Sequence, residues 1–214
     1  MTNNIKNMDS AWKIQYDKRA KLNIPDYKKS FWTEKGHIEL IEITTALIEK
    51  IKNVKTIIDV GCGTGILCKK LSEKNYDIIG VDYSENLIEL CKNKYPELNF
   101  IVANGYNLPF KDKQFDTAIS VGVLQCLYDH ERFIKELIRV SSKAVIISTL
   151  IKKKKSKNPL RTLKEQLKTD PYPCREYHLS EILPIFEKQK MKTSIITKFN
   201  GKKIELGCFI VAKY

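Results

Sequence analysis

The sequence has 214 residues, of which 43% are hydrophobic, and both values fit one globular domain rather than a disordered chain. No stretch approaches the roughly 20 apolar residues of a membrane helix, and the polar N-terminus lacks the apolar centre of a secretion signal. We therefore expect a cytoplasmic protein without membrane contact. The formal charge of +13 comes mostly from lysine and can reflect an A/T-rich genome as well as an acidic partner.

Six cysteines lie along the chain, at positions 62, 68, 91, 126, 174 and 208. None forms a C-x-x-C pair and no cluster of histidines accompanies them, so the sequence predicts neither a zinc site nor a disulfide framework. Reduced thiols are the expectation for a cytoplasmic protein. We expect Cys62, Cys68 and Cys126 to fill small apolar spaces.

The first part of the chain predicts helices. Over residues 5–53, apolar residues recur near helical spacing, and we expect breaks at Pro25 and Gly36. The pattern changes at Thr56–Val60, a β-branched apolar run that ends in glycines. Such a run indicates a strand buried on both faces, as in a parallel sheet.

The same strand-and-helix unit then recurs. Alternation of strands and helices of this length is typical of an α/β fold with a doubly wound, mostly parallel sheet and right-handed crossovers. Ser84 is the predicted N-cap of one of the helices. The further strands are predicted over 77–81, 99–103, 115–121 and 143–149, and the helices over 66–74, 85–94 and 132–140.

The end of the chain departs from this alternation. A helix is predicted over 180–189, and strands over 193–198 and 205–213 flank Asn200-Gly201, a strong hairpin signal. We therefore expect a seven-stranded sheet that finishes with an antiparallel C-terminal hairpin. The preceding segment, 151–175, is polar and basic and contains three prolines, and we interpret it as an inserted lid.

The strongest motif is the run DVGCGTG from Asp59 to Gly65, which follows a predicted strand and opens a helix. Glycines there allow a tight turn and the close approach of a ligand to the backbone. Asp82, at the end of the next strand, can accept hydrogen bonds from both hydroxyls of a ribose. A nicotinamide dinucleotide would favour G-x-G-x-x-G, but Ile66 stands where the third glycine would fall. Asp59 suits a ligand with a positive amino group, such as S-adenosylmethionine, which has no phosphate to bind.

Residues 56–121 resemble the core of the class I S-adenosylmethionine-dependent methyltransferases. DVGCGTG matches that family's first motif nearly letter for letter, and segments beginning at Val81, Ala103 and Phe115 resemble its second, third and fourth motifs. The resemblance is close over 55–150, loose over 176–214 and nearly absent over 1–54. It implies one Rossmann-like methyltransferase domain over 1–214. Its parts would be a helical cover (1–54), a cofactor-binding core (55–150), a lid (151–175) and a C-terminal helix with hairpin (176–214).

The resemblance implies S-adenosylmethionine as the cofactor and S-adenosylhomocysteine as its product. Asp59 would orient the amino group of the methionine part, through the loop or a water, and Asp82 would hold the ribose. Tyr83 would pack on the adenine, and Asn104 would accept from the adenine amino group where the family usually carries Asp. Val121 would lie near the transferred methyl group. The full set of implied cofactor contacts is Asp59, Gly61, Cys62, Gly63, Gly65, Asp82, Tyr83, Asn104, Gly105 and Val121.

No catalytic residue is assigned from the sequence, and no metal site is expected. Methyl transfer from a sulfonium is an in-line displacement that orientation can accelerate, and a base is needed only where the acceptor must lose a proton. Many relatives carry a His after the fourth strand, where this chain has Gln125, which cannot act as a base. Tyr16 in the N-terminal cover, with Tyr177 and His178 just after the lid, are our candidates for the acceptor pocket.

Three functions are open at this point. The first is methyl transfer to an oxygen or nitrogen of a small molecule, such as a metabolite, natural product or sugar-like intermediate, in an enclosed pocket. The second is methylation of RNA or protein, with the run Lys152-Lys153-Lys154-Lys155 in contact with the substrate. The third is a non-catalytic module that binds S-adenosylmethionine. The sequence does not identify the acceptor, the pathway or the oligomeric state.

Overall fold

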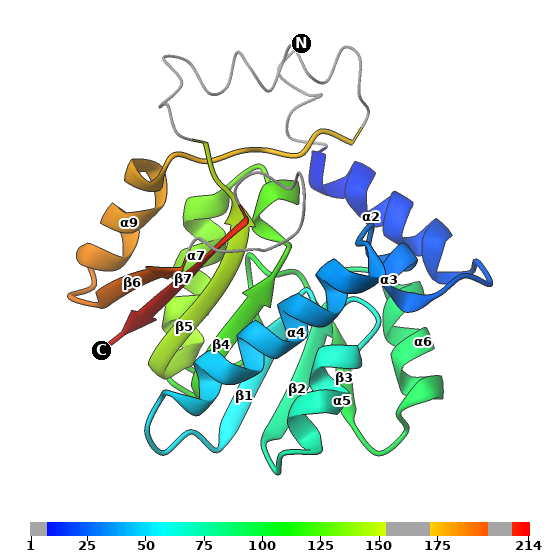
Figure 1. The fold of residues 1–214 in the computed structure, drawn as a ribbon, viewed down its shortest axis with the longest axis horizontal. Coiled ribbons are helices and arrows are strands. Elements are labelled where there is room, and N and C mark those ends of the chain that lie inside the picture. The colour runs from blue at the N-terminus through cyan, green and yellow to red at the C-terminus, as the bar shows by residue number, and fades with distance from the viewer. Residues whose placement is uncertain (1–7, 153–171, 197–206) are drawn as a thin grey trace.

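The computed structural model describes residues 8–152, 172–196 and 207–214. Within them, seven strands form one sheet in the order β3-β2-β1-β4-β5-β7-β6 (Figure 1). The strands from β3 to β5 are parallel, and β7 runs antiparallel to both β5 and β6. This arrangement confirms the predicted doubly wound sheet with an antiparallel C-terminal pair. The strands are β1 (Thr56–Val60), β2 (Asp77–Asp82), β3 (Asn99–Val102), β4 (Phe115–Val121), β5 (Ser141–Leu150), β6 (Lys192–Ile196) and β7 (Gly207–Lys213).

Helices cover both faces of the sheet (Figure 1). Ile57 packs with α4, α5 and α6 on one face, whereas its neighbour Ile58 packs with α7 and α9 on the other. Because the central strands are apolar on both sides, they form continuous hydrophobic runs in the sequence. The helices are α2 (Met8–Ala20), α3 (Asp26–Lys29), α4 (Glu34–Glu49), α5 (Ile66–Ser72), α6 (Glu85–Lys94), η1 (Leu124–Cys126), α7 (His130–Val140) and α9 (Leu179–Glu187). None of these described helices is long and apolar enough to cross a membrane.

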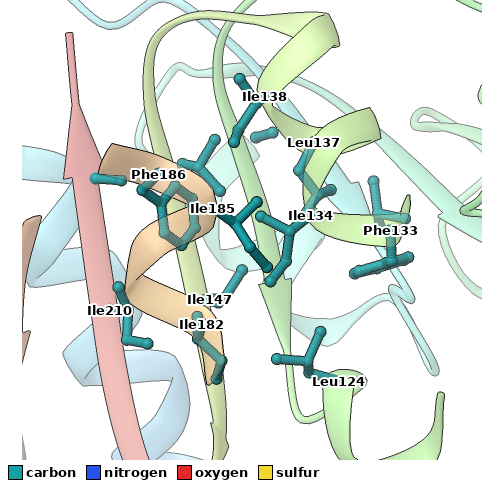
Figure 2. Packing of buried hydrophobic residues seen from close by; sticks show 14 of the residues in the cluster. Leu124, Phe133, Ile134, Leu137, Ile138, Ile147, Ile182, Ile185, Phe186 and Ile210 are labelled. Carbon is teal, nitrogen blue, oxygen red and sulfur yellow. The ribbon is translucent and has the colours of Figure 1, made fainter. Parts of the chain in front are cut away.

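One core lies between the pair α7 and α9 and strands β5 and β7 (Figure 2). Ile134 of α7 and Phe186 of α9 are fully buried, as are Ile147 of β5 and Ile210 of β7. Burial of side chains of this size stabilises the fold by about 1.5–3 kcal/mol each. This packing anchors the antiparallel end of the sheet to its parallel part.

The N-terminal cover consists of α2, α3 and α4, joined by polar contacts. Lys29 is 6% exposed and donates to the main-chain oxygens of Ala20 and Leu22 at the end of α2. Thr33 is the N-cap of α4, and its Oγ1 accepts from Gly36 N at 3.1 Å. The predicted break at Gly36 is therefore wrong. The cap at Thr33 starts the helix two residues before the glycine, and packing on the sheet then outweighs glycine's low helix propensity.

Caps also explain why two helix ends differ from their predicted bounds. The helix predicted over 132–140 begins at His130, because the Asp129 carboxylate accepts from Arg132 N at 3.1 Å. The helix predicted over 180–189 spans Leu179–Glu187. These differences are of the size expected when a helix end is set by a cap rather than by an apolar period.

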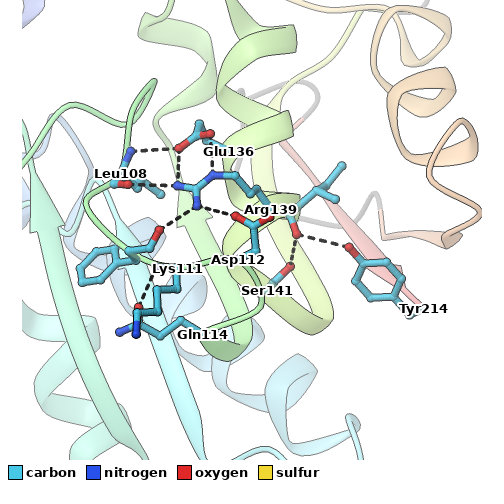
Figure 3. A network of polar contacts seen from close by, with 10 residues as sticks. Leu108, Lys111, Asp112, Gln114, Glu136, Arg139, Ser141 and Tyr214 are labelled. Carbon is cyan, nitrogen blue, oxygen red and sulfur yellow. Dashed lines mark hydrogen bonds and ion pairs between the residues drawn. The ribbon is translucent and has the colours of Figure 1, made fainter.

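A polar network fastens the connection between β3 and β4 to α7 (Figure 3). Arg139 donates to the carbonyl oxygens of Leu108 at 3.0 Å and Phe110 at 2.7 Å, and it pairs with Asp112 at 2.9 Å. Glu136 pairs with Arg139 at 2.8 Å and accepts from Leu108 N at 2.9 Å. These bonds satisfy main-chain groups of a connection that has no regular structure. They thereby fix this connection, whose first residues, 103–106, border the candidate site.

The described ends of the predicted lid lie side by side. Ile151 forms a parallel bridge with Tyr177, and Lys152 N donates to Tyr177 O at 2.8 Å. Tyr177 is therefore a neighbour of the residues that directly follow β5. The basic run beyond Lys152, at 153–155, and the predicted hairpin turn at 200–201 lie outside the described residues.

Buried thiols occupy several core positions. Cys62, Cys68 and Cys126 are buried, as predicted, and so are Cys91 and Cys208. Burial raises the pKa of the Cys208 thiol to about 12, which keeps it protonated at neutral pH. A buried, protonated thiol packs as a small hydrophobic group.

Candidate active site

A cavity of about 380 Å³ lies where the parallel strands end, between the sheet and the N-terminal cover. One wall combines the loop after β1 with the ends of β2 and β4 and the loop after β3. Residues from α2 and from 30–41 form the opposite wall. Open α/β sheets bind ligands at the carboxyl ends of their strands, next to the point where the strand order reverses. In this sheet the reversal lies between β1 and β4, so the cavity is the candidate active site.

The first glycine of the DVGCGTG loop forms the turn and part of the wall. Gly61 has a φ of +83°, and its N–H and that of Cys62 donate to Val81 O at 2.7 and 3.0 Å. A Cβ at position 61 would lie 2.2 Å from Val123 Cγ2. A side chain there would strain the backbone and displace Val123, so this position requires glycine.

The other two glycines have different surroundings. Gly63 has a φ of +56°, and a Cβ there would meet nothing closer than Ser30 Oγ at 3.5 Å, so its backbone borders open space. Gly65 is the N-cap of α5, and a Cβ there would lie 3.0 Å from both Cys91 Sγ and the Phe100 ring. Gly65 is not among the lining residues of the cavity. Close packing under the helix start therefore explains the third glycine of the motif.

Asp82 is held by main-chain donors at the end of β2. Its Oδ2 accepts from Gly63 N at 3.0 Å, and its Oδ1 accepts from Ser84 N at 2.9 Å. Burial raises the pKa of Asp82 to about 6, although the main-chain donors oppose the rise. The side chain is thus ionised at neutral pH, and each oxygen keeps capacity for another donor, such as a hydroxyl group.

Asp59 lines the same cavity and has a buried oxygen without a hydrogen-bond partner in the described part of the chain. It is 2% exposed, and its Oδ1 has no hydrogen-bond partner among the described residues. Its Oδ2 accepts a weak bond from Cys68 Sγ at 3.5 Å. Burial raises the pKa of Asp59 to about 7. Thr64 Oγ1, also buried in the lining, has no partner either. Two buried polar atoms without partners on one wall fit a polar ligand that donates hydrogen bonds.

The wall that contains Asp59 and Asp82 also has the exposed ring of Tyr83 and the side-chain amide of Asn104. Tyr83 is 42% exposed, and Asn104 Oδ1 accepts from Tyr106 N at 2.9 Å. A Cβ at Gly105 would lie 2.4 Å from the Phe133 ring, so only glycine fits between the cavity and α7. Tyr83, Asn104, Gly105 and Val121 all line the cavity, as do the other residues implied by the resemblance, with the exception of Gly65.

The opposite wall has a cluster of aromatic and apolar side chains beside polar ones. Trp12 and Tyr16 of α2 lie with their ring centroids 5.7 Å apart, and Phe31 packs edge-on against both rings at 5.6 Å. Trp32 lies next to the end of β4, where its Cζ2 would be 2.9 Å from a Cβ on Gly122. Trp12, Tyr16 and Trp32 line the cavity together with Leu40, Ile41 and Cys126. This wall, which we call the aromatic wall, matches no motif of the resemblance.

Few charged groups of the cavity lack a partner. Lys13 is the one lysine or arginine in the described lining, and its Nζ lies 2.9 Å from Asp17 Oδ2. Asp9 accepts from Tyr106 Oη at 2.7 Å, and burial raises the pKa of Asp9. Burial also lowers the pKa of His37, so its ring is neutral at pH 7 and can accept a proton. The sequence had no signal for Asp9 or His37, because the N-terminal segment carries no motif.

The three acceptor-pocket candidates are not brought together. Tyr16 lines the cavity, but Tyr177 and His178 do not. Tyr177 is fully buried and donates from its hydroxyl to Leu124 O at 2.9 Å. His178 is the N-cap of α9 and accepts from Ser180 N. Packing and capping therefore account for Tyr177 and His178, and their placement lends no support to a role in the pocket.

The sequence similarity to known proteins lies mainly in the part of the chain that contains β1 to β5. Residues 58–147 match the family described as a methyltransferase domain. Over 88 residues the chain is 43% identical to the tRNA (carboxymethyluridine(34)-5-O)-methyltransferase of Saccharomyces cerevisiae, across 40% of this chain and 30% of that protein. Over 131 residues it is 29% identical to the phthiotriol/phenolphthiotriol dimycocerosates methyltransferase of Mycobacterium tuberculosis, across 58% of this chain and 47% of that protein. The chain thus spans less than half the length of each of these two relatives.

The fold extends further than the sequence match. The magnesium protoporphyrin IX methyltransferase of Synechocystis, solved with bound S-adenosylhomocysteine, superposes with a TM-score of 0.71 at 18% identity. That similarity covers 97% of this chain and 95% of the other. The helical cover and the C-terminal hairpin are therefore parts of a shared fold, whereas the family match covers neither of them.

We predict that Asp59→Asn stabilises the protein without ligand above about pH 7. The raised folded-state pKa, about 7 against 3.8, means that the wild type loses stability as pH rises from about 4 to about 7, because the unfolded chain releases the proton first. Asn cannot ionise, so the variant escapes this loss, and the difference in the free energy of unfolding should reach a few kcal/mol, on the order of 2–4. Urea unfolding across this pH range measures it, with Asp77→Asn at the exposed start of β2 as the control. A difference that does not change with pH would contradict the prediction.

Proposed function

We propose that this chain, which belongs to the class I S-adenosylmethionine-dependent methyltransferases, transfers a methyl group to an oxygen or nitrogen atom of a small-molecule acceptor. The observation that carries the proposal is the cavity itself. One of its walls has the polar groups that suit the donor, and the other is the aromatic wall. The proposal that the acceptor is a small molecule depends on the aromatic wall.

The wall formed by the loops after β1 and β3 and the ends of β2 and β4, which we call the donor wall, fits S-adenosylmethionine. Asp82 would hold the ribose hydroxyls with the acceptor capacity that remains on its carboxylate, and Tyr83 offers an exposed ring face to the adenine. The unpartnered Asp59 Oδ1 would receive the amino group, and the exposed backbone at Gly63 would allow the ligand to approach closely. The cofactor supplies a methyl group on a sulfonium that carries its own leaving group. The protein's task is then to orient the acceptor and exclude water.

The aromatic wall supports a mostly apolar acceptor without negative charge. Trp12, Tyr16 and Trp32 line the cavity, and the described lining has no unpaired lysine or arginine to hold a phosphate or carboxylate. An anion placed there would lose its hydration without a compensating partner. A metabolite or natural product with an uncharged ring fits this chemistry better than a nucleotide. His37, neutral at pH 7, is available to take a proton from such an acceptor.

Methylation of RNA is the alternative, and the yeast relative is named a tRNA methyltransferase. The run Lys152-Lys153-Lys154-Lys155 would be its substrate contact, and only Lys152 of that run is described, paired with Glu181 at 3.8 Å. A module that binds the donor without catalysis is the third possibility. The same experiment separates all three.

The experiment supplies radiolabelled S-adenosylmethionine to the purified protein together with small-molecule, RNA and protein fractions of cell extract. Label in the small-molecule fraction would support the proposal, with Asp82→Ala as the inactive control. Label that enters RNA or protein would overturn the small-molecule acceptor. Tight binding of S-adenosylhomocysteine with no label in any fraction would favour the non-catalytic module.

Asp82→Ala should weaken binding of S-adenosylhomocysteine at least tenfold, about 1.4 kcal/mol, because it removes the acceptor of the ribose hydroxyls. Isothermal titration calorimetry at pH 7.5 measures the change. Asp77→Ala, at the exposed opposite end of β2, should bind like the wild type. Wild-type affinity in Asp82→Ala would refute the assignment of the donor site.

Tyr16→Ala should leave the affinity for S-adenosylhomocysteine within about threefold and reduce methyl transfer at least tenfold, about 1.4 kcal/mol in transition-state stabilisation. The reason is that Tyr16 belongs to the aromatic wall rather than to the donor wall. Ile14→Ala, which changes a side chain 52% exposed on the same helix, is the control for damage to α2. Equal losses of binding and of transfer in Tyr16→Ala would place this residue at the donor instead.

A further inference from the structure

We infer that Asp17, in the N-terminal helix α2, is a positioning residue for the donor site and acts through Ser84 on Asp82. The inference rests on the proposed function, because it concerns the affinity for the same donor. Neither the DVGCGTG motif nor the family match at 58–147 includes residue 17. The contacts that carry it are all between described residues.

A chain of short hydrogen bonds leads from α2 to the donor wall. Ser84 Oγ donates to Asp17 Oδ1 at 2.5 Å and accepts from Leu87 N at 3.1 Å. Ser84 N donates to Asp82 Oδ1 at 2.9 Å. Ser84 is 1% exposed, so both of its polar groups are committed to these bonds. The position of its hydroxyl is thus fixed from one side by Asp17 and from the other by the start of α6.

Asp17 is itself firmly held at the start of α6. Its Oδ1 also accepts from Asn86 N at 3.3 Å, and its Oδ2 accepts from Lys13 Nζ at 2.9 Å. A carboxylate at a helix N-terminus is stabilised by the main-chain N–H groups that the helix leaves unpaired. Burial opposes ionisation, but the bonds from Ser84 and Lys13 outweigh it and lower the pKa of Asp17. The residue is therefore charged at neutral pH and acts as a fixed acceptor.

The same helix reaches the other loop of the donor wall. Near the start of α2, Asp9 accepts from Tyr106 Oη at 2.7 Å, next to the loop that contains Asn104 and Gly105. Trp12 and Tyr16, between the two aspartates, belong to the aromatic wall. Helix α2 thus contacts the loop after β2 through Asp17 and the loop after β3 through Asp9, and two of its aromatic residues line the cavity. Asp17 is the member of this set that touches the Asp82 loop.

The test is a double-mutant cycle on the affinity for S-adenosylhomocysteine. Asp17→Ala should weaken binding at least fivefold, because Ser84 loses the acceptor that fixes its hydroxyl. In a Ser84→Ala background the same change should have less than a twofold effect, since the hydroxyl that links Asp17 to residue 84 is already absent, whereas the main-chain bond from residue 84 to Asp82 remains. Asp17→Asn keeps an oxygen acceptor for Ser84 and should restore most of the affinity.

Asp26→Ala is the matched control. Asp26 also joins the cover to α6 through an ion pair, but with Lys94 at the opposite end of the helix, and neither residue lines the cavity. It should bind like the wild type, and circular dichroism should report intact helices in every variant.

The outcomes distinguish this inference from the proposed function. If Asp17→Ala binds like the wild type, or loses as much affinity in the Ser84→Ala background as in the wild type, the inference is overturned while the donor site stands. If the wild type itself fails to bind S-adenosylhomocysteine, the proposed function fails and the inference falls with it.

Discussion

Two main-chain hydrogen bonds, from Gly61 N and Cys62 N to Val81 O, set the arrangement of the donor site. They require a left-handed residue at position 61, which glycine adopts at little cost, and they join the turn after β1 to the end of β2. Because the two strand ends are joined, Gly63 N comes within 3.0 Å of Asp82 Oδ2, and Asp59 lines the same cavity. The donor wall is thus a consequence of parallel strand pairing rather than of separately folded loops.

The parts of the fold that sequence reasoning predicted are those in which local chemistry decides. Strand Thr56–Val60 is apolar and β-branched, and Ser84 caps α6 as its residue type suggests. The predicted break at Gly36 is wrong because a glycine's weak helix propensity is a local cost that a cap and tertiary packing override. Tyr177 donates to a carbonyl oxygen of η1, and His178 caps α9. Both contacts depend on the tertiary fold, and no spacing in the sequence encodes them.

The donor wall concentrates buried negative charge that the folded chain alone does not compensate. Burial raises the pKa of Asp59 to about 7 and that of Asp82 to about 6, and both shifts mean that ionisation destabilises the folded state relative to the unfolded chain. A cationic ligand with hydroxyl donors would relieve that cost. Under the proposed function, binding of such a ligand would be favoured by the same burial that makes ionisation of these carboxyl groups costly.

The two walls of the cavity differ in how far they are shared with relatives. The donor wall lies almost wholly within 58–147, the segment that matches the methyltransferase domain, whereas Trp12, Tyr16 and Trp32 lie before it. Relatives that match in the core carry names for acceptors as different as a tRNA and a dimycocerosate, so the match in the core does not identify an acceptor for this chain. Among the described lining residues, those outside the matched segment belong to the cover, and α2 is the element of the cover that touches both donor loops. Under the proposed function, a change of acceptor that leaves the donor affinity intact would keep Asp9 and Asp17 on α2 and alter the rings of Trp12 and Tyr16 between them.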